Sequence, residues 1–321
     1  MERHEREMIE IKEYIMELSN VVIKAVRDNY DAISSKKRLG LSPGGDTQFS
    51  IDEIAEKTIY DFIANHGEKI AYYSEDRGLV KFNQNPEYML IIDPIDGTRG
   101  AAAGLECCCF SIAVAEYSED ATINDVKYAL LYEFKNDVWF YSDYTQNDIS
   151  VTGAAIKLSP NTDINNMFWS MEFNGHPARL MTYSLGDLID LSANQGGIFI
   201  FNSSTYSISR IITGQLDAYV DIGNRLLKDV PELDEEFRRV GNGQILHLFP
   251  YDISAAVYLA KKAGVVITDA YGNDLGNTRL ADISDHNLQS CVAAGNKELH
   301  SRIIEKINWI QDYSQVRDII H

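Results

Sequence analysis

The chain is poor in positive charge. Its 321 residues contain 29 Lys and Arg against 48 Asp and Glu, which gives a formal net charge of −19. Such a charge repels the phosphate backbone of nucleic acids, so we expect no binding to DNA or RNA polymers. It would also repel a small phosphorylated molecule, unless metal ions reverse the local potential at the site.

Cysteines, histidines at metal-site spacing and long apolar runs are also scarce. Three of the four cysteines are consecutive (107–109), in an apolar stretch typical of a buried strand, and adjacent cysteines rarely reach disulfide geometry. The seven histidines lack the spacing of a zinc site such as H-E-x-x-H. The first residues are too charged for a secretory signal, and no apolar run is long enough to span a membrane. We therefore expect a reduced, cytoplasmic protein that does not associate with membranes.

Hydrophobic periodicity predicts a protein that mixes helices and strands. The predicted helices cover 8–30, 51–65, 185–193, 204–213 and 252–263. The predicted strands cover 70–73, 89–92, 110–115, 126–133, 138–142, 197–201, 218–222 and 265–268. A polar stretch at 145–165 suggests a boundary. We expect an N-terminal α+β domain over residues 1–150 and a C-terminal α/β domain over residues 151–321.

The sharpest local feature is the segment D-P-I-D-G-T over residues 93–98. An apolar run ends there in Asp93 and Asp96, at the carboxyl end of a predicted strand, where α/β folds usually bind ligands. Gly97 lets the backbone approach a ligand, and a helix that starts near Thr98 would favour an anion. Oxygen ligands suit Mg²⁺ or Mn²⁺. The alternative is a simple turn, since these residue types favour turns.

Two further acidic points matter. Glu75 and Asp76 follow the strand predicted over 70–73, which again puts carboxylates at a strand end. Asp252 opens the helix predicted over 252–263. Taken alone, helix capping explains Asp252, and surface solvation explains the acidic pair. Neither point would indicate a metal site by itself.

Together the segments resemble the magnesium-dependent, lithium-sensitive phosphatases of the inositol monophosphatase and fructose-1,6-bisphosphatase superfamily. The family pattern is an acidic pair, then D-P-(I/L)-D-G-T, then W-D, eleven residues and G-G. The chain keeps this order with Glu75-Asp76, the 93–98 segment and Tyr251-Asp252, and eleven residues (253–263) separate Asp252 from Gly264. Residues 46–52 place two aspartates as in the family's D-x-V-T-x-x-D, and residues 213–219 resemble T-G-x-x-D-A-Y. The resemblance covers roughly residues 8–300 and implies a layered αβαβα sandwich of the sugar-phosphatase type.

The resemblance implies a phosphomonoesterase that uses two or three Mg²⁺ ions, or Mn²⁺, to activate water. The implied metal ligands are Glu75, Asp93, Asp96, Asp252 and the Ile95 carbonyl. Glu75 and Thr98 would activate the water, with Asp52 bonded to the Thr98 hydroxyl. The amides of Gly97 and Thr98 would hold the phosphate, and the alcohol part would contact Asp96, Ser203, Ser204 and Asp221. The implied partners are a small phosphorylated metabolite and, as a homodimer, a second copy of the chain.

The chain departs from the family pattern most between Asp221 and Asp252, where inositol monophosphatases are much shorter. This insertion carries the basic residues Arg225, Lys228, Arg238 and Arg239. They could grip a second phosphate. The interpretation that we prefer is a solvated helix face that pairs with nearby acidic residues.

Several points stay open. Inositol monophosphate is the leading substrate class, and fructose 1,6-bisphosphate, 3′-phosphoadenosine nucleotides and histidinol phosphate are alternatives. Arg99-Gly100 after D-G-T resembles relatives directed at nucleotides or histidinol phosphate. A non-catalytic protein that binds phosphorylated metabolites is a remote alternative. His176 and His247 could lie near the site, although isolated histidines are more often incidental.

Overall fold

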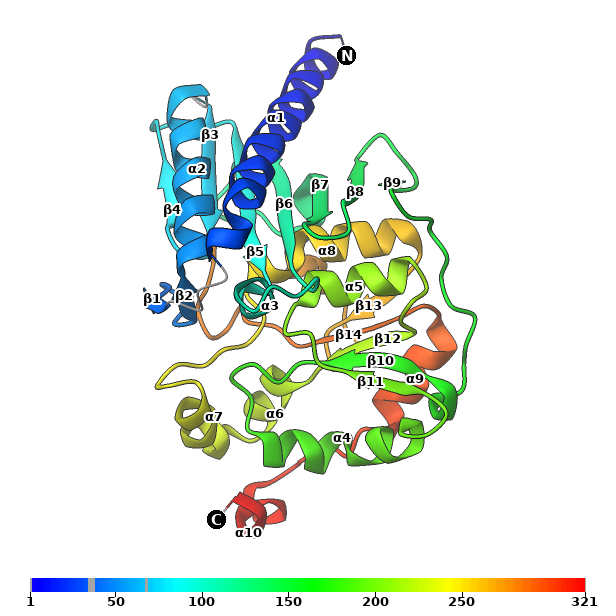
Figure 1. The fold of residues 1–321 in the computed structure, drawn as a ribbon. Coiled ribbons are helices and arrows are strands. Elements are labelled where there is room, and N and C mark those ends of the chain that lie inside the picture. Colours follow the sequence, from blue (N-terminus) through cyan, green and yellow to red (C-terminus); the bar gives the residue numbers. More distant parts are fainter. Residues whose placement is uncertain (1, 34–37, 67–68, 321) are drawn as a thin grey trace.

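The computed structural model describes residues 2–33, 38–66 and 69–320. Two β-sheets and three layers of helices are stacked in the order α/β/α/β/α (Figure 1). This architecture confirms the layered sandwich that the resemblance implied. In the described ranges, none of the helices combines the length and the apolar character that crossing a lipid bilayer requires.

The larger sheet has seven strands in the order β4-β3-β5-β6-β7-β8-β9. Its strands are β3 (Ile70–Ser74), β4 (Gly78–Lys81), β5 (Tyr88–Asp96), β6 (Cys109–Glu116), β7 (Val126–Glu133), β8 (Val138–Asp143) and β9 (Ser150–Thr152). β3 and β5 run parallel, and the other neighbouring pairs are antiparallel. The strands predicted in the first half are all present, whereas the edge strands β4 and β9 were not predicted.

The two faces of this sheet pack against different helices, because successive side chains of a strand point to opposite faces. Leu90 and Ile92 of β5 belong to a buried cluster that they share with Leu18 and Ile59, from the two N-terminal helices. Met89 and Ile91 belong to a second cluster, which extends into the rest of the chain. The helices that cover the two faces are α1 (Glu2–Ile33) and α2 (Ser50–His66) on one side, and α5 (Ser204–Ile212) and α8 (Pro250–Ala263) on the other.

The smaller sheet has the strand order β11-β10-β12-β14-β13. Its strands are β10 (Phe168–Met171), β11 (Gly197–Phe199), β12 (Ala218–Asp221), β13 (Val266–Thr268) and β14 (Cys291–Ala294). α5 and α8 lie between the two sheets, and α4 (Ala178–Ser192) and α9 (Lys297–Lys306) cover the outer face (Figure 1). The predicted alternation of strand and helix in the second half is therefore confirmed.

Shorter elements complete the chain. The remaining strands form a hairpin of β1 (Arg38–Leu41) and β2 (Thr47–Phe49). The remaining α-helices are α3 (Thr98–Ala102), α6 (Gly223–Asp229), α7 (Asp234–Val240) and α10 (Arg317–Ile320). Short 3-10 helices cover Ile123–Asp125, Ile164–Asn166, Pro231–Leu233, Leu275–Asn277 and Tyr313–Gln315.

The expected domain boundary between residues 150 and 151 falls inside β9, which pairs with β8 in the larger sheet. The second buried cluster joins Met89 of the first half to Val220 of the second. The two halves thus share a core, and the division into two domains stays a prediction.

Candidate active site

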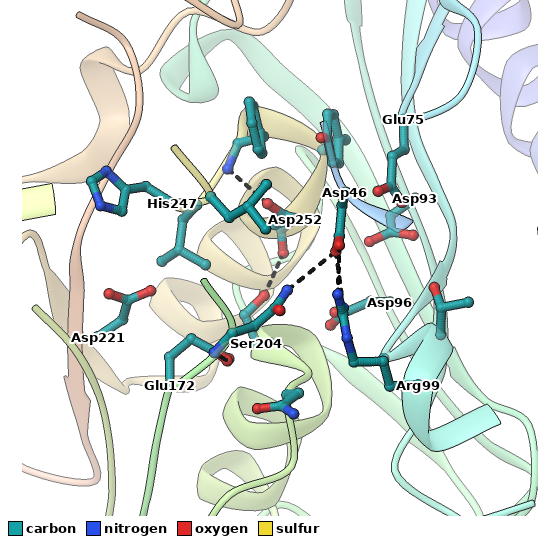
Figure 2. Close-up of a pocket in the computed structure, with 18 of the residues that line it drawn as sticks. Asp46, Glu75, Asp93, Asp96, Arg99, Glu172, Ser204, Asp221, His247 and Asp252 are labelled. Carbon is teal, nitrogen blue, oxygen red and sulfur yellow. Dashed lines mark hydrogen bonds and ion pairs between the residues drawn. The ribbon is translucent and has the colours of Figure 1, made fainter. Parts of the chain in front are cut away.

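The acidic residues at the ends of β3 and β5 lie side by side. The two strands are parallel, with Ser74 opposite Ile92, so Glu75 follows one strand at the level where Asp93 continues the other. The ladder between β5 and β6 becomes irregular between Asp93 and Asp96, which frees the chain to turn. These residues line one cleft of about 620 Å³, including its solvent-open part, together with Asp252 from α8 (Figure 2).

Backbone amides orient two of these carboxylates. Asp93 Oδ1 accepts from the Ile95 N–H at 3.0 Å, and Asp252 Oδ2 accepts from the Phe249 N–H at 2.7 Å. Asp252 is the third residue of α8, because the helix begins at Pro250 rather than at Asp252 as we expected. Asp252 therefore both stabilises the first turn of its helix and faces the cleft, so capping and site formation are compatible.

Asp96 is held by the first residues of α5. Its Oδ2 accepts from the Ser203 hydroxyl at 2.8 Å, from the Thr205 N–H at 2.6 Å and from the Thr205 hydroxyl. Ser203 also caps α5 and does not line the cleft. Ser204 does line it, and its hydroxyl donates to the Asp252 carbonyl at 2.9 Å. The two serines expected to touch the substrate thus fasten α5 to the acidic residues, and their substrate contacts stay predictions.

The cleft is strongly unfavourable to several negative charges at once. Burial raises the pKa of Glu75, Asp93, Asp96 and Asp252, and neighbouring carboxylates raise the pKa values of Glu75, Asp93 and Asp252 further. Among the neighbouring carboxylates, Asp52, buried in the first turn of α2, raises the pKa of Glu75 most. Buried carboxylates of like charge need a cation to be ionised together.

The donor chemistry of the cluster fits a hard divalent cation, since every side-chain donor is a carboxylate oxygen. As the side chains are placed, however, no group of three or more His, Cys, Asp or Glu residues in the described ranges is arranged to hold a metal ion. The ligand set for such a cation therefore stays a prediction.

The turn after Asp96 requires glycine. Gly97 has a φ of 84°, and a Cβ placed on it would lie 2.4 Å from the Cys107 carbonyl oxygen. α3 begins at Thr98, as expected. The Thr98 hydroxyl donates to the Ile95 carbonyl at 2.9 Å. A bond in which Thr98 donates to Asp52 would need the hydroxyl to turn, so that contact stays a prediction.

The cleft also contains Arg99 and Asp46, whose pairing the sequence did not predict, and Asn174 and Glu172, which the sequence did not single out. Arg99 donates to both carboxylate oxygens of Asp46, at 2.6 and 3.0 Å, and Asn174 donates to the same carboxylate at 3.1 Å. Glu172 lines the side of the cleft that lies away from Glu75 and Asp93 (Figure 2). It directly follows β10, just as Glu75 directly follows β3, but no strand was predicted over residues 168–171, so the strand-end signal used for Glu75 did not identify it.

The histidines and the predicted alcohol-binding residue share one side of the cleft. Asp221, His176 and His247 all line it, so the two histidines are part of the site rather than incidental. The His176 Nε2 donates to Asp221 Oδ1 at 3.0 Å. Burial alone would lower the pKa of His176, but the charge of Asp221 and this hydrogen bond outweigh it and raise the pKa. Burial and the neighbouring His176 lower the pKa of His247 well below its usual range.

The basic residues of the insertion do not reach the cleft, which contradicts the idea that they grip a second phosphate. Arg238 pairs with Asp234, Arg239 with Glu236 and Arg225 with Asp229, each within one helix. Arg225 also lies against the ring of Trp309, 3.5 Å from its centroid, and Lys228 donates to the Leu288 carbonyl. The preferred interpretation, a solvated helix face paired with nearby acidic residues, is confirmed for Arg238 and Arg239. Arg225 is paired but largely covered, and Lys228 bonds to a carbonyl. The insertion instead contributes His247 to the cleft.

Comparisons with known proteins agree with the geometry. The model of the inositol monophosphatase family matches residues 7–312. The fructose-1,6-bisphosphatase of Pyrococcus furiosus is 23% identical over 239 residues, which cover 74% of this chain and 76% of that protein. A Methanocaldococcus jannaschii protein named fructose-1,6-bisphosphatase/inositol-1-monophosphatase is 24% identical over 267 residues, which cover 83% of this chain and 87% of that protein.

Solved structures show the same fold. The Thermotoga maritima IMPase matches with a TM-score of 0.65 and 18% identity, over 97% of this chain and 99% of that one. The family match spans nearly the whole chain. The acidic motifs follow one another along the sequence in the family's order, and in the structure they line one cleft. The chain therefore belongs to the inositol monophosphatase family, and it is a phosphatase.

Proposed function

We propose that the chain is a magnesium-dependent phosphomonoesterase that hydrolyses a small phosphorylated metabolite, of the inositol monophosphate type, by attack of an activated water. The observation that carries the proposal is the convergence of four carboxylates, the buried Asp93 and Asp96 and the partly buried Glu75 and Asp252, beside the Gly97–Thr98 turn in one cleft. The size of this cleft suits a metabolite rather than a polymer.

The proposed metal ligands are the residues that the resemblance implied. Glu75, Asp93 and the Ile95 carbonyl would hold one ion, Asp93, Asp96 and Asp252 a second, and a third would bind more weakly near Glu75. Bound divalent cations would neutralise the phosphate and lower the pKa of the attacking water. The raised pKa values of the carboxylates support this set, because the anionic forms need such a counter-charge.

The chain's own groups would position the water and the phosphate. The Thr98 hydroxyl donates its hydrogen bond to the Ile95 carbonyl. The Thr98 Oγ1 can therefore accept a hydrogen bond from the water. Glu75, with Asp52 behind it, would accept the proton that the water loses. The N–H groups of Gly97 and Thr98 would hold the phosphate, and Asp96, Ser203, Ser204 and Asp221 would contact the alcohol part.

The remaining alternatives concern the substrate. Fructose 1,6-bisphosphate, 3′-phosphoadenosine nucleotides and histidinol phosphate stay candidates beside inositol monophosphate. A non-catalytic protein would be expected to lack a metal ligand or Thr98, and all of these residues are present. Lithium inhibition, a homodimer and a cytoplasmic location are predictions that follow from the resemblance or the composition.

A phosphate-release screen tests the proposal. The four candidate substrates and an aryl phosphate would be incubated with Mg²⁺ or with EDTA. We expect release from at least one substrate with Mg²⁺, and none with EDTA or with the Asp93→Asn variant. Release that continues in EDTA would contradict metal dependence, and no release from any substrate with Mg²⁺ or Mn²⁺ would contradict the phosphomonoesterase activity.

A further inference from the structure

Glu172, Asp221 and His247 lie on the side of the cleft away from Glu75 and Asp93 (Figure 2). His176 belongs with them, because it lines the same cleft and bonds to Asp221. We call these four residues the far compartment. Asp221 lies at the end of β12 and Glu172 directly after β10, and these strands are parallel neighbours in the smaller sheet. Two of the four residues are therefore placed by neighbouring strand ends, and His176 and His247 come from connecting segments.

Asp221 has an acceptor with no partner. Its Oδ1 accepts from the Gly223 N–H and from His176, each at 3.0 Å. Its Oδ2 has no hydrogen-bond partner among the described residues, although the side chain is only 1% exposed. A buried carboxylate oxygen without a donor is costly, so this atom is suited to receive a donor from a ligand.

Glu172 adds a second carboxylate to the compartment, and few positive charges lie near it. Its Oε1 accepts from the backbone N–H groups of Phe173 and Asn174, at 2.9 and 2.8 Å. Arg99 is the sole Lys or Arg among the described residues that line the cleft, and it gives its two terminal nitrogens to Asp46. Burial and the charge of Asp221 raise the pKa of Glu172 to about 7. His176 is the one basic group that faces both carboxylates.

His247 presents a neutral N–H. Its Nδ1 lies 3.1 Å from the Asn224 side-chain nitrogen, which can only donate, so Nδ1 accepts and Nε2 carries the proton. This Nε2 is buried and has no partner in the described ranges. The compartment thus sets two carboxylates, Glu172 and Asp221, against one basic group, His176, and adds the uncharged N–H of His247. Because the carboxylates outnumber the basic group, the set favours a cation over an anion.

Resting on the proposed phosphatase function, we propose that the far compartment binds a protonated amine of the substrate between Glu172 and Asp221, so that the preferred substrate is the monophosphate of an amino alcohol. His247 would donate to an oxygen of the same alcohol. A second phosphate would be rejected, because no unpaired basic residue of the described cleft lining could receive it. Of the four candidate substrates, histidinol phosphate alone carries an aliphatic amine.

Two esters of matched size test the inference. Phosphoethanolamine and ethylene glycol monophosphate differ only in an ammonium against a hydroxyl, and an aryl phosphate reports phosphatase activity without an amine. We expect kcat/KM with Mg²⁺ to be at least about tenfold higher for phosphoethanolamine than for its hydroxyl analogue, since a hydrogen bond to a charged group typically contributes that much.

Variants then locate the preference. Glu172→Gln should reduce the ratio of the two kcat/KM values toward one, and Asp221→Asn should do the same. Glu235→Gln removes an exposed carboxylate on α7 and should leave the ratio unchanged. Thermal melts would confirm that each variant folds, and the wild-type ratio is informative even without them.

The outcomes separate the two proposals. Hydrolysis of the aryl phosphate with equal kcat/KM for the matched pair, or with a preference for the hydroxyl ester, would overturn the amine site and leave the phosphatase function standing. An equal loss on both esters in Glu172→Gln would also overturn it. No hydrolysis of any of the three esters with Mg²⁺ would overturn the proposed function and the inference together.

Discussion

Replacing Asp93 by Asn should stabilise the metal-free protein and abolish its response to magnesium. Asp93 is 2% exposed, and its pKa is raised by burial and by the charges of Asp96 and Glu75. Asn has nearly the same shape and can still accept from the Ile95 N–H, so the substitution removes mainly the charge. The unfavourable charge is absent from the variant, so we expect its Tm in EDTA at neutral pH to exceed that of the wild type.

The second expected effect is the stabilisation of the folded protein by bound Mg²⁺. A ligand at about a hundred times its dissociation constant stabilises the folded state by about 2.7 kcal/mol. In a chain of this size each kcal/mol shifts Tm by about 2 °C, so Mg²⁺ should raise the wild-type Tm by about 5 °C and the Asp93→Asn Tm by much less.

Thermal melts in EDTA and in Mg²⁺ measure both effects. Asp190→Asn on α4 is the matched control, because it removes an exposed carboxylate outside the cleft and should keep the wild-type response. A Mg²⁺ shift of equal size in Asp93→Asn, or a lower Tm than wild type in EDTA, would refute the reasoning that a shared metal ligand is held among repelling charges.

Three further predictions concern other parts of the chain. Thr98→Ala should lower kcat by at least about tenfold and leave KM nearly unchanged, because the hydroxyl would orient the attacking water in the transition state. Steady-state kinetics measure both constants. A rise in KM alone would make Thr98 a substrate-binding residue instead. Arg238→Ala combined with Arg239→Ala should leave kcat/KM for mono- and bisphosphates unchanged, because both side chains pair with acidic residues of their own helix. A loss of kcat/KM on a bisphosphate alone would show that these residues bind the second phosphate. Glu56→Gln should raise stability at pH 8 but hardly at pH 4.5. Burial raises the pKa of Glu56 from 4.5 to about 7, so the folded state binds more protons than the unfolded state between these values, and its carboxylate costs up to about 3 kcal/mol once the pH exceeds 7. Melts of both proteins across that range check the sign, and a constant difference in Tm would contradict it.

The sequence predicted the parts of the site that are encoded locally. An apolar strand, an aspartate and a turn glycine are all present within residues 89–98, so the position of Asp93 at a strand end follows from neighbouring residues. Helices α1, α2, α4, α5 and α8 and the inner strands of the larger sheet were predicted for the same reason. The edge strands β4 and β9 were missed because they are short and pair on one side only. The inner strands β10 and β14 of the smaller sheet, each of four residues, were missed as well.

The far compartment could not be predicted because it depends on distant pairings. Glu172 faces the cleft only because β10 lies beside β12 in the smaller sheet and that sheet packs under α5 and α8. His247 reaches it through the insertion, whose path periodicity does not specify. Arg99 was noticed for its position after D-G-T, but its pairing with Asp46 depends on how the β1–β2 hairpin folds back over the cleft.

Ser203 and Thr205, which donate to Asp96, are synthesised 107 and 109 residues after it, so the site is assembled late in synthesis. During synthesis, β3 and β5 leave the ribosome long before α5 and α8, so Glu75, Asp93 and Asp96 exist for some time without Asp252 and without the groups that hold Asp96. On the proposed ligand set, a nascent or truncated chain would carry these three residues but would not hydrolyse phosphate esters. Hydrolysis would then begin only after both sheets have formed around α5 and α8.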